Sequence, residues 1–172
     1  ARRAFTVLET FGHHPTLLDI GGGFSSENLE TVLPASIAIN EAIQEHGFGS
    51  CEVIAEPGRF FVEHAIQLQT VIIGVKPGCV TIDESLYGAF NCVVMDHAKP
   101  EPLKEYPGTY EKYTVFGCTC DGADVIGEVE LPEHIWVGWT LTWPRMGAYT
   151  LAATTNFNGL PFNSRERKYI WT

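Results

Sequence analysis

The chain has 172 residues, of which 45% are hydrophobic and 12% aromatic, enough apolar material for one ordinary core or for two smaller ones. Acidic side chains outnumber basic ones by 21 to 11, a formal charge of -10 that disfavours nucleic-acid and anionic-membrane partners and weakly favours a cationic small molecule. No apolar stretch approaches the roughly 20 residues of a membrane helix and none resembles a signal peptide, so we expect a cytoplasmic protein.

The first predicted elements are a strand, a glycine turn and a helix. Residues 16–20 form an apolar run that ends in three consecutive glycines at 21–23. A helical pattern follows, which Ser25 or Ser26 can cap. A second apolar run, 51–55, ends in Glu-Pro-Gly-Arg at 56–59 and repeats this plan. Strand, turn and helix in succession are typical of a parallel sheet.

From about residue 66 the pattern becomes β-rich, with short apolar segments broken by turns. The segments that we expect to be strands are 66–75, 79–82, 91–95, 113–118, 125–129, 140–143, 149–153 and 168–171. Many short strands of this kind indicate an antiparallel sandwich or barrel. The boundary between the two kinds of pattern lies near residues 63–70.

The two turns of the first region have the composition of a phosphate site. Glycines such as Gly22, Gly23 and Gly58 let backbone N–H groups approach an anion closely, and Arg59 adds a charged fork of donors. In (β/α)8 barrels, phosphate frequently binds between the loops after the last two strands. We therefore expect α/β plus all-β architecture: residues 1–65 as the last units of a (β/α)8 barrel, and 66–172 as a β-sandwich or barrel domain.

Alternative roles exist for the same residues. Three glycines after a strand can form a plain tight turn, and Arg59 can form a surface salt bridge. Glu56 can be a solvated rim residue, or it can keep the ring nitrogen of a pyridoxal cofactor protonated. The five cysteines show no paired spacing for disulfides or zinc, and the histidines, His97 included, show no ligand spacing, so we expect no metal.

Five motifs, in order along the chain, make the resemblance to a known family specific. They are LLDIGGGF (17–24), AEPGRFFV (55–62), LYGAFNCVVMDHA (86–98), CTCDGAD (118–124) and MGAYTLAATTNFNG (146–159). Together they resemble the ornithine decarboxylase family. The resemblance implies a pyridoxal 5'-phosphate-binding barrel followed by a β domain, in a homodimer with shared active sites.

The resemblance also implies roles for single residues. Gly23, Arg59 and Tyr149 would bind the cofactor phosphate, and Glu56 would meet the pyridine nitrogen. Two aspartates from different subunits would hold the distal amino group of the substrate, which corresponds here to Asp96 and Asp121. Paired carboxylates suit this task because an ammonium group that leaves water needs charged acceptors.

A second set of matches concerns protonation and the lining of the shared site. Cys120 resembles the residue that controls protonation of the decarboxylated carbon, for which a labile thiol proton is suited. Tyr87, Asp124 and Phe157 match residues that line or support the site. Their alternative role is packing, and the alternative for Cys120 is a buried structural cysteine.

The sequence also departs from the family. The family's reaction needs a lysine on the first barrel strand, and no lysine here lies in a matching motif. Only about 65 residues are barrel-like, whereas a whole barrel takes about 250. The family's NDG motif is replaced by residues 83–85, a proline by Cys118 and an aspartate by Trp139. These changes bear on fine specificity and dimer geometry more than on reaction class.

Three functions remain open from the sequence. The first is decarboxylation of L-ornithine to putrescine in polyamine biosynthesis. The second is a non-catalytic regulator similar to antizyme inhibitor, with antizyme as its partner; the retained site residues argue against it. The third is a related decarboxylase of lysine, diaminopimelate or arginine, and the short side chain of Asp96 argues against arginine.

Overall fold

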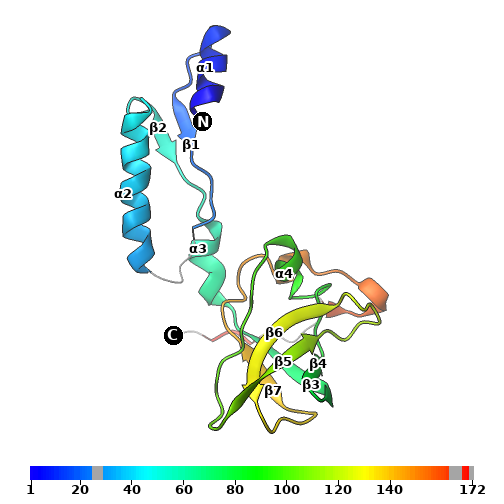
Figure 1. The fold of residues 1–172 in the computed structure, drawn as a ribbon. Coiled ribbons are helices and arrows are strands. Elements are labelled where there is room, and N and C mark those ends of the chain that lie inside the picture. The colour runs from blue at the N-terminus through cyan, green and yellow to red at the C-terminus, as the bar shows by residue number, and fades with distance from the viewer. Residues whose placement is uncertain (25–28, 163–167, 171–172) are drawn as a thin grey trace. The chain divides into compact units, whose positions relative to one another are not determined.

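A computed structural model of the protein describes residues 1–24, 29–162 and 168–170. The chain divides into two compact units, Ala1–Val62 and Glu63–Thr172. The expected cap of the first long helix, Ser25 or Ser26, lies outside the described residues. Each unit is built around its own sheet (Figure 1).

The first unit is a pair of parallel strands with a helix between them in the chain. Its elements are α1 (Arg2–Thr10), β1 (Leu17–Asp19), α2 (Leu29–Glu45), β2 (Glu52–Ile54) and α3 (Gly58–Val62). Leu18 pairs with Val53 in the middle of the parallel ladder, as the strand, turn and helix pattern predicts. The opening helix α1 was not predicted; it is amphipathic, and the ring of its Phe5 meets Phe48 edge-on at 4.7 Å.

The second unit is a curled, mixed sheet of five strands that forms a half-barrel (Figure 1). Its strands are β3 (Leu68–Lys76), β4 (Cys79–Ile82), β5 (Tyr110–Phe116), β6 (Val125–Pro132) and β7 (Thr140–Trp143), in the order β6-β5-β4-β3-β7. The prediction of a sheet domain is confirmed. The sheet is not wholly antiparallel, however, because β4 and β5 pair in parallel. The 27-residue connection between them, residues 83–109, gives the chain the length to return for that pairing.

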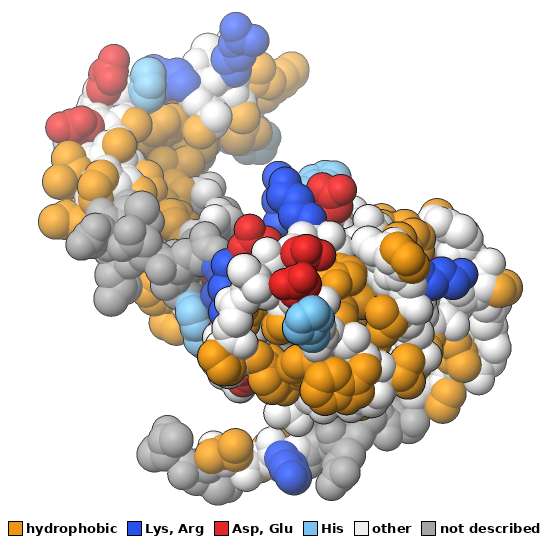
Figure 2. All heavy atoms as spheres, turned by 60° about the horizontal axis from the view of Figure 1, so that its bottom comes forward, with side chains coloured by type: hydrophobic (Ala, Val, Ile, Leu, Met, Phe, Trp, Pro, Cys, Tyr) orange, Lys and Arg blue, Asp and Glu red, His pale blue; other side chains and the backbone are white. Residues whose placement is uncertain are grey.

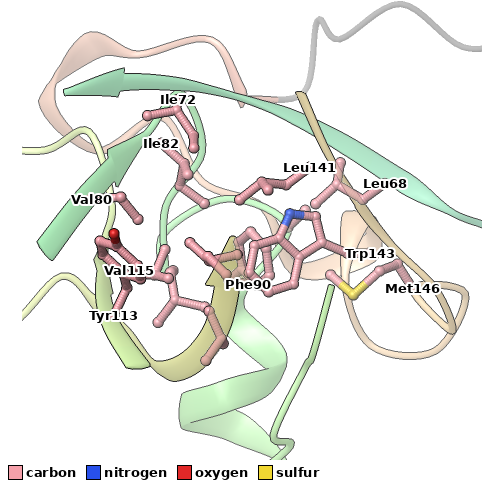
Figure 3. Packing of buried hydrophobic residues seen from close by; sticks show 14 of the residues in the cluster. Leu68, Ile72, Val80, Ile82, Phe90, Tyr113, Val115, Leu141, Trp143 and Met146 are labelled. Carbon is pink, nitrogen blue, oxygen red and sulfur yellow. The ribbon is translucent and has the colours of Figure 1, made fainter. Parts of the chain in front are cut away.

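The core of this unit lies on the concave side of the sheet. Along β3, Leu68, Thr70 and Ile72 are buried while the alternate residues are more exposed, the period of a half-buried strand. Trp143 is fully buried and meets Phe90 edge-on at 4.9 Å (Figure 3). The short helix α4 (Asn91–Met95), which follows Phe90, lies at one end of the half-barrel (Figure 1).

Three of the predicted strands are wrong. Residues 91–95 form α4, and residues 149–153 include the 3-10 helix η2 (Leu151–Ala153). Residues 168–170 have no regular structure, and Trp171 lies outside the described residues. In 91–95 the two valines indicate a strand, but hydrogen bonds of Asn91 favour the helix. Its amide donates to the carbonyl of Gly88, three residues earlier, and to that of the distant Thr150, at 2.6 Å each.

The surfaces of both units carry many apolar side chains (Figure 2). In the described part of the first unit, Leu18 and Phe48 are the buried hydrophobic residues, whereas Leu33, Ile37 and Phe61 are at least half exposed. Among the described residues, no helix is both long enough and apolar enough to cross a membrane.

Candidate functional site

The glycine turn and the arginine turn lie side by side in the first unit. The backbone N–H of Glu56 donates to the carbonyl of Gly21 at 2.8 Å, and that of Ile20 donates to Ile54 at 3.0 Å. The carboxylate of Asp19 accepts from the N–H of Gly21 at 2.7 Å and fixes the start of the turn. Both turns follow the carboxyl ends of parallel strands, the edge at which α/β sheets bind ligands.

Glycine is required at the point where the two turns meet. A Cβ atom on Gly22 would lie 2.6 Å from the carbonyl oxygen of Glu56, so any side chain there would separate the turns. Gly23 has φ +87°, a conformation that residues with side chains adopt rarely. Because Gly22, Gly23, Glu56 and Gly58 are exposed and Arg59 is half-buried, the residues of this cradle are open to a ligand. The donor set suits a phosphate group.

A second cluster of expected site residues lies in the second unit, around Tyr87. The phenol of Tyr87 donates a short hydrogen bond to one carboxylate oxygen of Asp121. The N–H of Ala123 donates to the other oxygen at 2.9 Å. Since an ionised carboxylate offers about four acceptor positions, Asp121 keeps capacity for a further donor such as an ammonium group.

The hydrogen bond shifts the titration of both partners. It lowers the pKa of Asp121, chiefly because the phenol stabilises the ionised carboxylate, with the N–H of Ala123 adding to the effect. The same bond raises the pKa of Tyr87, with burial and the nearby charge of Asp121 contributing less. Asp121 is therefore an anion and Tyr87 a proton donor at neutral pH.

Two cysteines near this cluster differ in how exposed they are to solvent. The sulfur of Cys120 is exposed and accepts a hydrogen bond from the amide Nδ2 of Asn158 at 3.2 Å. Burial raises the pKa of the neighbouring Cys118 thiol, and the carboxylate of Asp124 adds to the effect. Cys118 thus stays protonated, and Cys120 is the accessible thiol beside Asp121.

The segment that carries Tyr87 is tied to the loop that carries Cys120 and Asp121 by a buried carboxylate. Asp124 accepts hydrogen bonds from the hydroxyl of Ser85 at 2.9 Å and from the hydroxyl of Thr119 at 2.6 Å. The N–H groups of Leu86 and Thr119 complete its shell at 2.9 and 3.1 Å. The buried Asp124 therefore links the segment that carries Tyr87 to the loop that carries Cys120 and Asp121.

Comparison with known proteins shows the family of the chain. Residues 31–147 match the family model of the pyridoxal-dependent decarboxylase C-terminal sheet domain. The chain belongs to the pyridoxal-dependent decarboxylase family. The resemblance read from the sequence motifs is thereby confirmed.

Individual relatives differ in activity. The chain is 41% identical to a chloroplastic ornithine decarboxylase of Nicotiana glutinosa, over 84% of this chain and 37% of that protein. It is 40% identical to antizyme inhibitor 2 of Xenopus laevis, over 92% of this chain and 40% of that one. The crystal structure of the arginine decarboxylase of Paramecium bursaria Chlorella virus superimposes with a TM-score of 0.74 at 39% identity, covering 92% of this chain and 45% of that one.

The chain thus spans less than half the length of these relatives. The similarity establishes a family of pyridoxal-dependent decarboxylases. It does not decide which amino acid is the substrate, because relatives of different activity match the chain.

Among the described residues no group of three or more histidine, cysteine or acidic side chains could hold a metal ion.

The remaining expected site residues lie on other segments of the second unit. Asp96 is exposed at the end of α4, where the backbone turns sharply at His97 with φ 54°. Tyr149 is exposed and has φ 54°, uncommon for a bulky residue. Its neighbour Thr150 is anchored on both sides, since its hydroxyl donates to Met146 at 2.6 Å and its carbonyl accepts from Asn91.

Some residues of the cluster were missed from sequence. Phe157 was expected near the site, and its ring stacks on Tyr87 with centroids 4.0 Å apart. Two further residues contact the cluster and were not predicted as site residues: Asn158, which donates to Cys120, and Thr155, which donates to the carbonyl of Tyr87. The Asn-Gly pair at 158–159 does carry a signal, because this dipeptide favours a left-handed turn. Ser85 was noted as a departure from the family, but its bond to Asp124 has no signature in the sequence.

Proposed function

We propose that this chain is the carboxyl-terminal part of an enzyme that removes the α-carboxylate of L-ornithine as carbon dioxide and leaves putrescine. The observation that carries the proposal is the cluster in which the phenol of Tyr87 donates to the ionised Asp121, which follows the exposed thiol of Cys120 on one loop. A carboxylate suits the distal ammonium of a basic amino acid, and a thiol suits proton delivery.

The first unit is proposed to supply the end of a (β/α)8 barrel and the cofactor cradle. The close meeting of Gly22 with the Glu56 carbonyl supports this, because it brings the glycine turn against the turn that leads to Arg59. Gly22, Gly23, Gly58 and Arg59 would hold the phosphate of pyridoxal 5'-phosphate, and Glu56 its pyridine nitrogen. When bound, the cofactor supplies an electron sink for the electron pair left by the departing carboxylate.

The second unit is proposed to supply the substrate and proton-transfer groups. Asp121 and, from the other subunit of a homodimer, Asp96 would hold the distal ammonium. Cys120 would carry the proton that replaces the lost carboxylate. Tyr87 keeps Asp121 ionised and oriented, and Tyr149 would add a hydroxyl donor for the cofactor phosphate.

A chimera tests this proposal. Residues 1–172 replace the matching segment of the Nicotiana glutinosa ornithine decarboxylase, and carbon dioxide release is measured from ornithine, lysine and arginine. We expect ornithine to be preferred and Asp121→Ala to lower kcat/KM for carbon dioxide release by about 100-fold or more. Cys120→Ala, which removes the proposed proton donor, should lower the putrescine formed per carbon dioxide released. Cys79→Ala, which changes a cysteine on β4, is the matched control and should leave the rate within about twofold.

A second function is favoured by one specific observation, the 40% identity to antizyme inhibitor 2. Under that alternative the chimera folds, dimerises and binds pyridoxal 5'-phosphate but releases no carbon dioxide from any of the three amino acids, and it binds antizyme in a pull-down with purified proteins. A preference for arginine or lysine over ornithine would instead reassign the substrate within the family.

A further inference from the structure

Asn158 contacts the thiol on which the proposed proton transfer depends. Its Nδ2 lies 3.2 Å from the sulfur of Cys120 and donates a hydrogen bond to it. A neutral thiol is a weak acceptor, whereas a thiolate is a strong one, because hydrogen bonds to ionised acceptors are roughly twice as strong. A donor at this position therefore stabilises the thiolate of Cys120 more than it stabilises the thiol.

The turn that carries Asn158 is held in place by the rest of the cluster. Asn158 lies in η3 (Phe157–Gly159) with φ 56° and ψ 18°, a left-handed conformation that asparagine tolerates better than most residues. Thr155 anchors the approach to this turn, since its N–H donates to the carbonyl of Tyr87 at 2.9 Å and its hydroxyl accepts from the N–H of Phe157 at 3.2 Å.

These contacts form a ring that joins the amide of Asn158, the thiol of Cys120 and the carboxylate of Asp121. Asn158 touches Cys120, Phe157 stacks on Tyr87, and Tyr87 donates to Asp121, the residue after Cys120 in the chain. The amide of Asn158 is thus directed at the sulfur by the same residues that orient the proposed ammonium-binding group.

We propose that Asn158 is a positioning residue for Cys120, an inference that rests on the proposed function. Its N–H occupies one side of the sulfur, so that the S–H proton points elsewhere. In the protonation step the S–H bond breaks, the electron pair of the decarboxylated carbon forms the new C–H bond, and the sulfur keeps its pair as a thiolate. Asn158 stabilises that thiolate until water returns a proton to it.

Thiol alkylation in the 172-residue chain tests the contact without turnover. The chain is treated with iodoacetamide at pH 7, and the rate at Cys120 is followed by mass spectrometry of the peptides. Asn158→Asp keeps the shape and tolerates the left-handed backbone, but it replaces the donor with a negative charge. We expect alkylation of Cys120 to slow by about threefold or more, because the thiolate is the reactive form.

Two controls separate this effect from others. Asn156→Asp adds the same charge at an exposed position two residues away and should change the rate less than twofold. Alkylation of Cys51, in the first unit, should be the same in all variants and reports on the chain as a whole. An unchanged rate at Cys120 in Asn158→Asp, or equal effects of the two aspartates, would overturn the proposal.

The chimera supplies a second, independent readout. Because the thiol acts after carbon dioxide has left, Asn158→Asp should lower the putrescine formed per carbon dioxide released, whereas a merely structural role would leave that ratio at its wild-type value. A chimera with no decarboxylation at all would sink the proposed function, and the alkylation rates would still decide whether Asn158 controls the thiol.

Discussion

At the scale of single residues, Asp124 shows how a buried charge can organise a loop. The carboxylate is 1% exposed and accepts four hydrogen bonds, two from hydroxyls and two from backbone N–H groups. A Cβ atom on Gly117 would lie 2.2 Å from it, so the glycine makes room for the carboxylate. Multiple donors offset the cost of taking this charge out of water.

We predict that Asp124→Asn destabilises the second unit. The amide NH2 of an asparagine would face one of the four groups that now donate to Asp124. The hydrogen bonds to the remaining oxygen would also weaken, because the acceptor would no longer carry a negative charge. The expected loss in the free energy of unfolding is about 2 kcal/mol, measured by urea denaturation. Glu128→Gln, an exposed carboxylate on β6, should cost less than about 0.5 kcal/mol. Equal stabilities of the two variants would contradict this account of Asp124.

The Tyr87–Asp121 hydrogen bond gives a prediction about titration. Asp121→Asn should return the pKa of Tyr87 toward its ordinary value, because it removes the main cause of the increase. The pKa of Tyr113 is raised by burial and by Glu111 and Glu133, so it should not move. Ring carbon shifts of labelled tyrosines, followed by NMR through the alkaline range, distinguish the two phenols.

The sign of the pH dependence follows from the two shifts. The pKa of Asp121 is lowered in the folded state, so its contribution to stability is present above the unfolded pKa, about 4, and is lost as the pH falls through the folded value. The pKa of Tyr87 is raised, so its contribution is present below about pH 10 and is lost as the pH rises through the folded value. Between these limits the pair contributes a constant amount.

The sequence motifs predicted part of the cluster around Tyr87, but not the burial of its cysteines or the contact from Asn158. The motifs pointed to Tyr87, Cys120 and Asp121, and the structure connects Tyr87 directly to Asp121. The sequence does not show that Cys118 is half-buried while Cys120 is exposed, because the two occupy similar positions in one short motif. The contact from Asn158 joins residues 38 positions apart and depends on how the chain folds back.

At the scale of elements, hydrophobic periodicity predicted β4 and β7 at their observed bounds. It failed for 91–95 because a short apolar run has the same local pattern in a strand and in a short helix. The parallel pairing of β4 with β5 was also missed, since pairing depends on the connection of residues 83–109 and not on the strands themselves.

The pairing of β3 with β7 carries a prediction of its own. Thr70 lies opposite Leu141, and its hydroxyl accepts from the indole N–H of the fully buried Trp143 at 2.9 Å. Thr70→Val keeps the shape but leaves the indole N–H without this acceptor in the core. We expect a loss of about 1–3 kcal/mol by urea denaturation.

Thr114→Val is the matched control for that change. Thr114 is half-buried on β5, and its replacement should cost less than about 1 kcal/mol or stabilise the sheet slightly. A Thr70→Val variant as stable as wild type would show that the indole finds another acceptor.

At the scale of the whole molecule, the two units differ in how much apolar surface they bury. The second unit has a contiguous cluster of buried side chains around Trp143 and Phe90. The described part of the first unit buries Leu18 and Phe48, while both of its short strands present apolar residues such as Leu17 and Ile54 to solvent. A two-stranded sheet of three residues per strand is marginal in water without further strands or helices against it.

We therefore predict unequal protection in the isolated 172-residue chain. Backbone amides of β1, β2 and α2 should exchange with deuterium at least about 100-fold faster than those of β3 to β7, because few buried contacts oppose local opening. In the chimera, where the rest of the relative's chain can pack against the first unit, the same amides should become protected. Equal protection of both units in the isolated chain would mean that the first unit folds without such neighbours, and would remove the main physical reason for assigning it to a larger barrel.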